Sequence, residues 1–346
     1  MRQPLDCVNR DNILIEIKNK GIILVESILS YFASLNPMNL LGSMPGAIAQ
    51  GIIWGIMALG VYITFRILDI ADLTVDGSFT TGGAVTVMLK IAGFPMWSCL
   101  FIAVLAGLAA GAVTGLLHTK LGIPAILSGI LTQLALYSIN LRIMGMSANK
   151  SFNFGETDLY VTLGNIPMAI LVTAIFAIAI ILLLYWYFGT EQGSALRATG
   201  SNHSMSSAQG ININNMKIIG LALSNALVAL SGGLMSQFQG YVDINMGRGA
   251  IVIGLAAVII GEVIGLALLG KHLNFWGKLT FVVLGGVVYY IVISIVLWLK
   301  LDSNDLKLFT AVIVALFLAV PYLKGQKKSS FKLAKKRGEK LDAENK

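Results

Sequence analysis

Long apolar runs separated by short polar segments fill most of this chain. The runs predict helices at residues 46–66, 75–92, 96–117, 123–143, 166–188, 215–238, 250–269, 277–299 and 306–323. Most are close to the roughly 20 residues that a helix needs to cross the hydrocarbon core of a bilayer. They are much longer than the ~10-residue alternating strands of a membrane barrel. The pattern therefore predicts an all-α fold, a polytopic transmembrane helical bundle of about nine spans, with a range of eight to ten.

The run at 75–92 is the weakest of these, because its first half is polar and rich in glycine. Such a segment predicts one broken or irregular span that other helices shield from lipid. Asp69, Asp72 and Asp76 cluster where this run begins, at spacings that would suit a cation, but the further oxygen ligands of a calcium loop are missing. We interpret Asp76-Gly-Ser78 as a turn in the broken helix.

A polar segment at 189–214 separates two long uncharged runs. It is built of small and polar residues, with enough Ala, Leu, Met and Gln for one or two short helices. Its glycines predict the helix breaks: Gly193, Gly200 and Gly210. A fully solvated loop would leave apolar side chains such as Leu196 and Met205 without a partner surface. We therefore predict a short helix on the membrane surface that docks another molecule.

Composition and charge support a membrane protein. Of the 346 residues, 56% are hydrophobic and 12% are charged, whereas soluble domains carry about 25% charged residues. The net charge of +8 does not indicate nucleic-acid binding, because Lys and Arg lie in loops and in the tail after Pro321. Under the positive-inside rule, this distribution places the C-terminus and the 189–214 segment in the cytoplasm. We predict a multi-pass protein of the cell membrane.

Three regions follow one another along the chain. Residues 46–323 form the transmembrane domain, and residues 324–346 form a basic cytoplasmic tail. Residues 1–45 form an N-terminal extension in which the apolar stretch from Ile22 to Leu35 is short for a span. An interfacial helix is the preferred interpretation of this extension, and a short tenth span is the alternative.

The sequence contains no recognisable catalytic motif. Cys7 and Cys99 form no metal or redox motif, and none of the three histidines has Cys or Glu at a metal spacing. The chain also lacks the G-x4-G-K-[ST] phosphate loop. We predict a chain that is not an enzyme and has no catalytic residue, metal or cofactor of its own. If it takes part in ATP-driven transport, ATP and Mg²⁺ belong to an ATPase on another chain.

Glu262 is the only acidic residue deep inside a strong apolar run. A charge at that depth is costly unless it is paired or protonated. It could be the proton-coupling carboxylate of an ion-coupled secondary transporter. It could instead bond to a neighbouring helix or reach a hydrated cavity, and the lack of an evident partner at its depth in the sequence favours this second interpretation.

Several separated motifs resemble one family in the right order. The segment Gly193-Ser-Ala-Leu-Arg-Ala-Thr-Gly-Ser-Asn202, continuing to Ala208-Gln-Gly-Ile-Asn212, is similar to the coupling segment of ABC importer permeases of the branched-chain amino acid and ribose class. Within that class, four stretches resemble a subgroup that pairs with tryptophan- or tyrosine-type lipoprotein binding proteins: 62–68, 73–79, 137–145 and 243–249. The resemblance covers about residues 46–322.

The resemblance implies one half of an ATP-driven importer for a small solute, with an amino acid, and an aromatic one, favoured. Two copies of this permease would form the pathway, and ATPase subunits would bind the coupling segments. An extracellular solute-binding lipoprotein would deliver the solute. The alternative remains an ion-coupled secondary transporter that uses Glu262, and a non-transporting scaffold would leave the 189–214 segment unexplained.

The resemblance also implies roles for individual residues. The ATPase-coupling group is Gly193, Leu196, Arg197, Gly200, Asn202, Met205 and Gly210. Within it, Arg197 would anchor at the ATPase cleft, and Leu196 and Met205 would pack into that cleft. The pathway-lining group is Asp76, Ser78, Phe79, Asn140 and Glu262. The binding-protein contacts are Asp243, Asn245 and Arg248.

Overall fold

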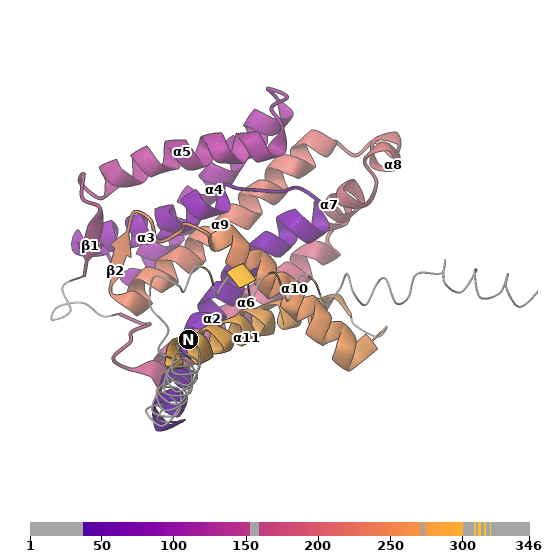
Figure 1. Cartoon of the computed structure of the whole chain (residues 1–346). Coiled ribbons are helices and arrows are strands. Elements are labelled where there is room, and N and C mark those ends of the chain that lie inside the picture. Colours follow the sequence, from indigo (N-terminus) through magenta and orange to yellow (C-terminus); the bar gives the residue numbers. More distant parts are fainter. Residues whose placement is uncertain are drawn as a thin grey trace, which may run out of the picture.

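The computed structural model describes residues 37–152, 159–270 and 274–299, together with residues 308, 311, 312, 315 and 319. Long helices form one bundle, which confirms the all-α prediction (Figure 1). The elements in chain order are α2 (Pro37–Tyr62), the π-helix η1 (Ile63–Ile67), α3 (Val75–Ile91), α4 (Met96–Thr119), α5 (Ala125–Ile143), β1 (Asn149–Ser151), α6 (Ile166–Gly189), α7 (Glu191–Ser201), α8 (His203–Ala208), α9 (Ile213–Gln239), β2 (Tyr241–Asp243), α10 (Ala250–Leu269) and α11 (Phe275–Trp298).

Seven helices of the described chain are long and apolar enough to cross a membrane. They match seven of the predicted spans, and α2 begins earlier than expected, at Pro37. The run at 75–92 forms α3, which has 17 residues. The predicted span at 306–323 and most of the 1–45 extension lie outside the described residues. The chain is therefore a multi-pass helical protein, and the count of about nine spans stays a prediction.

Helix α9 lies at the centre of the bundle and packs against α2, α3 and α4. Its middle and last turns are buried almost without interruption. Glycine makes this packing close: a Cβ added at Gly111 of α4 would lie 2.2 Å from the carbonyl oxygen of Leu221 on α9. Between membrane helices, small residues allow the backbone-to-backbone approach that favours association.

The prediction of a broken span at 75–92 is wrong in its position. Helix α3 is continuous and largely buried, and the irregular backbone lies before it, in η1 and in residues 68–74. Neighbouring helices supply the shielding that was predicted, so a polar, glycine-rich sequence can remain helical there. Asp76 accordingly lies in the first turn of α3 and not in a turn between helix fragments.

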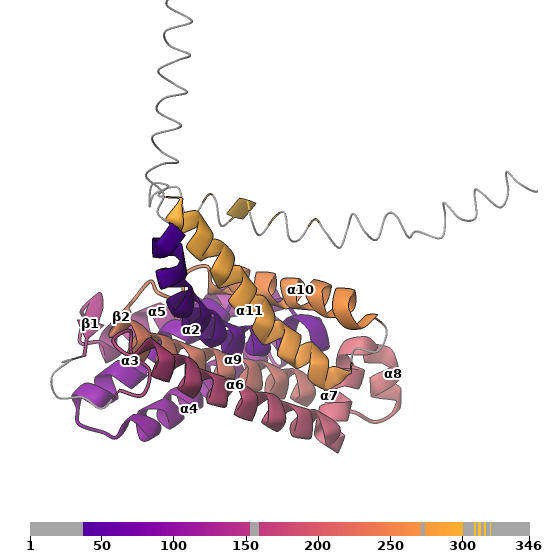
Figure 2. The ribbon, with the colours of Figure 1, turned by 90° about the horizontal axis from the view of Figure 1, so that it is seen from below.

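The bundle has two distinct ends, which Figure 2 shows on opposite sides of the molecule. At the sheet end, β1 pairs antiparallel with β2, and Asn149 lies opposite Asp243. At the coupling end, α7 and α8 connect α6 to α9. The 189–214 segment thus forms two short helices that sit together at one end of the bundle, as predicted from its polarity.

Candidate transport and coupling sites

Helix α7 begins with a side-chain cap directly after α6. The hydroxyl of Thr190 donates to the carbonyl oxygen of Tyr187 at 2.6 Å and accepts from the backbone N–H of Gly193 at 3.3 Å. A Cβ at Gly193 would lie 2.3 Å from the Tyr187 carbonyl oxygen. Gly193 is therefore the point where α7 comes close to the end of α6. It lies inside α7, and the prediction that it breaks the helix is wrong.

Gly200 holds the other end of α7 against η1. A Cβ at this position would lie 1.7 Å from the carbonyl oxygen of Ile67, so only glycine fits. Leu196 is fully buried, and it lies close to Gly220 of α9. Helix α7 ends one residue after Gly200, at Ser201, so the predicted break lies next to this glycine. Leu196 packs into its own bundle, which corrects the prediction that it packs into a partner.

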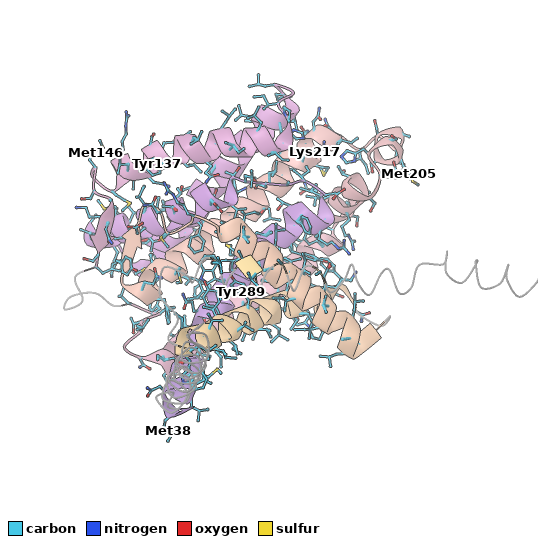
Figure 3. The ribbon with its side chains drawn as sticks, viewed as in Figure 1. Met38, Tyr137, Met146, Met205, Lys217 and Tyr289 are labelled. Carbon is cyan, nitrogen blue, oxygen red and sulfur yellow. The ribbon has the colours of Figure 1, made fainter. Side chains whose placement is uncertain are left out.

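Asn202 and Gly210 mark the two helix breaks in the 189–214 segment. The side chain of Asn202 accepts from the backbone N–H of Met205 at 3.0 Å and caps α8. Gly210 adopts φ +82°, the left-handed conformation that favours glycine, and it separates α8 from α9 as predicted. Met205 on α8 is 60% exposed and points away from the bundle (Figure 3).

Arg197 is engaged within the chain. Its Nη2 donates to the carbonyl oxygen of Phe188 at 2.8 Å, and its guanidinium lies 5.7 Å from the centre of the Phe275 ring. These contacts tie α7 to α6 and α11. In the single chain, Arg197 thus fixes the orientation of α7, while its side chain keeps an exposed surface.

Glu262 has a partner that the sequence did not reveal. Arg66 Nε of η1 lies 2.7 Å from Glu262 Oε1 of α10. Arg66 is 58% exposed and immediately precedes Ile67, the residue against which Gly200 packs. This pair agrees with the preferred interpretation that Glu262 bonds to a neighbouring helix, and it supplies the partner that was not evident in the sequence. The pair links α10 to the part of η1 that carries α7.

Asp76 joins two helix N-termini. From the first turn of α3, its carboxylate accepts from the backbone N–H groups of Gly249 and Ile251, each at 3.0 Å. Those N–H groups open α10, where a negative charge is stabilised by both the free donors and the helix dipole. Asp69 is exposed and Asp72 bonds to Thr74 and Asn225, so the three aspartates do not converge on one site.

A cavity of about 390 Å³ borders this junction. It contains two predicted pathway residues, Asp76 and Asn140, and one predicted binding-protein contact, Arg248. Asn140 Nδ2 donates to the carbonyl oxygen of Gly77 at 3.4 Å, whereas its buried Oδ1 has no partner in the described chain. Ser78 is fully buried and lines neither this cavity nor the next one.

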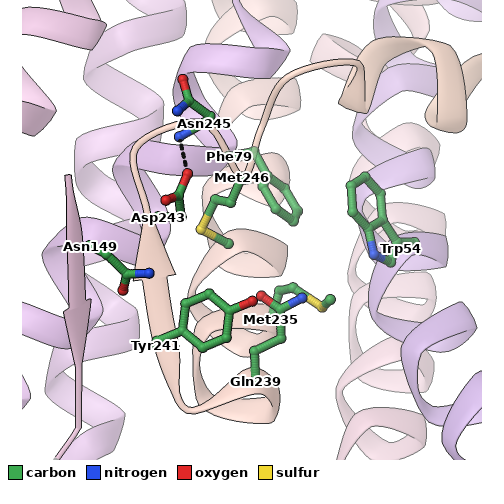
Figure 4. A pocket seen from close by; sticks show the side chains of 9 residues that line it. All are labelled: Trp54, Phe79, Asn149, Met235, Gln239, Tyr241, Asp243, Asn245 and Met246. Carbon is green, nitrogen blue, oxygen red and sulfur yellow. Dashed lines mark hydrogen bonds between the residues drawn. The ribbon is translucent and has the colours of Figure 1, made fainter. Parts of the chain in front are cut away.

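A second cavity, of about 370 Å³, borders β2 and the loop that follows it (Figure 4). This cavity brings together residues that were predicted to have two different roles. Its lining includes the pathway residue Phe79 and the binding-protein contacts Asp243 and Asn245. Trp54 of α2 also lines it and stacks on Phe79 with ring centres 4.8 Å apart. Sequence reasoning missed Trp54 because it stands in a long apolar run, where an indole resembles any core residue.

Comparison with known proteins identifies the family. A family model described as branched-chain amino acid transport system / permease component matches residues 43–321. The tyrosine transport system permease protein of Clostridioides difficile (strain R20291) is 41% identical over 294 residues, which cover 85% of this chain and 96% of that protein. An uncharacterized protein of Rickettsia prowazekii (strain Madrid E) is 32% identical over 273 residues, covering 79% and 95% of the two chains. The autoinducer 2 import system permease protein LsrC of Yersinia pseudotuberculosis (serotype O:1b, strain IP 31758) is 30% identical over 255 residues, covering 72% and 69%. The family match includes all of the described bundle after the first turns of α2. This chain therefore belongs to the family of branched-chain amino acid transport system permease components of ABC importers.

Proposed function

We propose that this permease forms the membrane pathway of an ATP-driven importer for an amino acid, with an aromatic amino acid favoured. The observation that carries the substrate class is the 41% identity to a tyrosine transport system permease over 96% of that protein. Two copies of the permease would enclose the pathway. A separate ATPase with ATP and Mg²⁺ would power it, and an extracellular binding lipoprotein would deliver the substrate.

The geometry of the coupling end supports an attached motor. Helix α7 is fixed to η1 through Gly200, and η1 is joined to α10 by the Arg66–Glu262 pair. A push on α7 would therefore reach α10, whose N-terminus is held by Asp76 of α3. We propose the coupling end as the cytoplasmic face, with the C-terminus on the same side, and Met205 as an exposed contact for the ATPase.

The sheet end supports the opposite role. β2 ends at Asp243, and Asn245 and Arg248 follow it in the next loop, beside the two cavities. We propose that this end faces outward and receives the binding protein, and that Asp76, Phe79 and Asn140 lie along the solute path. The alternative of an ion-coupled carrier loses its main support, because Glu262 is paired with Arg66 and needs no coupling proton to neutralise it.

The test is reconstitution of the complete importer. The permease would be co-expressed with the ATPase and binding protein encoded beside it, purified, and placed in proteoliposomes. Uptake of radiolabelled tyrosine that requires ATP inside and the binding protein outside is the expected result. Uptake that persists without ATP, collapses with the proton gradient and is lost in Glu262→Gln would refute the ATP-driven mechanism.

A matched pair of variants tests the coupling surface. Met205→Asp places a charge on an exposed position of α8 and should weaken ATPase retention while the permease still folds. Tyr160→Asp at the opposite end, on a residue that is 44% exposed, is the control and should retain the ATPase fully. Equal retention by both variants would remove α8 from the ATPase contact.

A further inference from the structure

The cavity beside β2 combines an apolar wall with a single full charge. Phe79, Met235 and Met246 supply the apolar surface, and Asp243 is the only lining residue that is charged at neutral pH. The remaining polar lining is neutral: Asn149, Gln239, Tyr241 and Asn245, with the indole of Trp54. A ligand that matches this surface needs a sizeable apolar body and one positively charged group.

Trp54 provides the sharpest sign that the cavity receives a ligand. The residue is 94% buried, because only 6% of its surface is exposed, and its indole Nε1 has no hydrogen-bond partner in the described chain. A buried N–H without an acceptor is costly, so such a group is rare in a settled core. The indole lines the cavity wall, so a small rotation of the ring would turn this N–H toward an acceptor on a guest molecule (Figure 4).

Asp243 is held ready at the opposite side of the cavity. Its Oδ1 accepts from the backbone N–H of Asn245 at 2.7 Å, a bond that fixes the carboxylate on the loop after β2. β2 is itself fixed by its pairing with β1 and by the burial of Val242. The carboxylate is thus positioned in advance and does not need to be ordered when a cation arrives.

We infer that this cavity is a binding site for an amino acid with an aromatic or large apolar side chain, and that Trp54 and Asp243 recognise its two ends. The side chain of the ligand packs among Phe79, Met235 and Met246. Its ammonium group pairs with Asp243, and in tyrosine the phenolic oxygen at the far end of the side chain accepts from Trp54 Nε1. The volume of about 370 Å³ lies in the range of roughly 300–1,000 Å³ that is usual for small-molecule sites.

This inference rests on the proposed function for its biological meaning, but the site can be tested separately from import. The complete complex would carry Met246→Cys, in a background where Cys7→Ser and Cys99→Ala remove the native thiols. The rate of maleimide labelling at residue 246 then reports occupancy of the cavity. Tyr160→Cys, on an exposed residue that does not line the cavity, is the control.

L-tyrosine should slow labelling at residue 246 in a saturable manner and leave the control unchanged. Tyramine, which keeps both the ammonium group and the phenol, should also protect, and 3-(4-hydroxyphenyl)propionate should protect least, because it offers Asp243 no cation. Asp243→Asn keeps the acceptor for Asn245 but loses the charge, and should raise the half-protecting tyrosine concentration roughly tenfold. Trp54→Phe keeps the ring and should raise it by a smaller factor.

The outcomes separate the two proposals. Import of tyrosine, tryptophan, phenylalanine or leucine without protection at residue 246 by the imported amino acid would overturn the site and leave the proposed function standing. Protection that depends on Asp243, in a complex that imports no amino acid, would support the site and overturn the proposed substrate. Protection of equal strength by 3-(4-hydroxyphenyl)propionate would overturn the assigned role of Asp243, and with it the inference.

Discussion

The close contact between α7 and η1 at Gly200 predicts a clear effect of Gly200→Ala. The added methyl group would lie 1.7 Å from the carbonyl oxygen of Ile67, whereas ordinary contact begins near 3.4 Å. The obstacle is backbone and cannot rotate away, so α7 and η1 must separate by about 1.7 Å. Overpacking of this kind costs about 1–3 kcal/mol. Alanine also favours helix over glycine by about 1 kcal/mol, which opposes the expected loss.

The control for this change is Gly189→Ala. Gly189 is the last residue of α6, and a methyl group there meets nothing within 4 Å. Both variants gain helix propensity, but only Gly200→Ala displaces α7. If the displacement is passed to the ATPase interface, affinity for the ATPase should fall roughly five- to a hundredfold in Gly200→Ala. It should stay within twofold or so in Gly189→Ala.

The assay measures ATPase binding and ATP-dependent uptake on permeases that elute normally from a sizing column. We expect Gly200→Ala to fold, bind the ATPase weakly and lose uptake. Gly200→Ala with the affinity and uptake of the unmodified protein would refute the reasoning, because it would show that coupling does not need α7 to be held against η1.

Three further predictions concern single contacts. Asp76→Asn should lower the thermal midpoint in detergent by the equivalent of about 1–3 kcal/mol, because one of its two half-buried acceptor oxygens is replaced by a donor that faces an N–H. Asp69→Asn, on an exposed residue, should leave the midpoint unchanged. Arg66→Glu and Glu262→Arg should each lower coupled uptake, and the double exchange should recover part of it. Because Arg66 is 58% exposed, we expect each single change to alter the free energy of unfolding by about 1 kcal/mol or less. Uptake losses that simply add in the double exchange would contradict a direct pair. Leu196→Ala should lower the free energy that holds α7 in the bundle by about 2–5 kcal/mol, because this side chain is fully buried. Limited proteolysis should then cleave the 189–214 segment faster, and an unchanged cleavage rate would contradict the role of Leu196 in packing.

The polarity pattern of the sequence determined the main features of the fold. The sequence by itself determined the class of fold, because a bilayer admits few ways to satisfy a backbone and the apolar runs have the length of spanning helices. It also determined that 189–214 forms surface helices, since a small, polar segment between two spans cannot enter lipid. Gly210 was predictable as a break, and the family was predictable from the motifs themselves.

Tertiary structure alone decided what individual residues do. Gly193 and Gly200 look like helix breakers in sequence, but their carbonyl neighbours at 2.3 and 1.7 Å come from other elements, which makes them contact points. Glu262 looked unpaired because its partner Arg66 lies 196 positions away in the chain and meets it only in the folded bundle. Trp54 resembles an ordinary core residue in the sequence. In the folded bundle its indole N–H has no hydrogen-bond partner among the described residues, and the indole lines a cavity that Asp243 also lines. The local pattern of polar and apolar residues indicates whether a segment lies in lipid or in water. Contacts between distant segments depend on packing, which is fixed only when all the helices are in place.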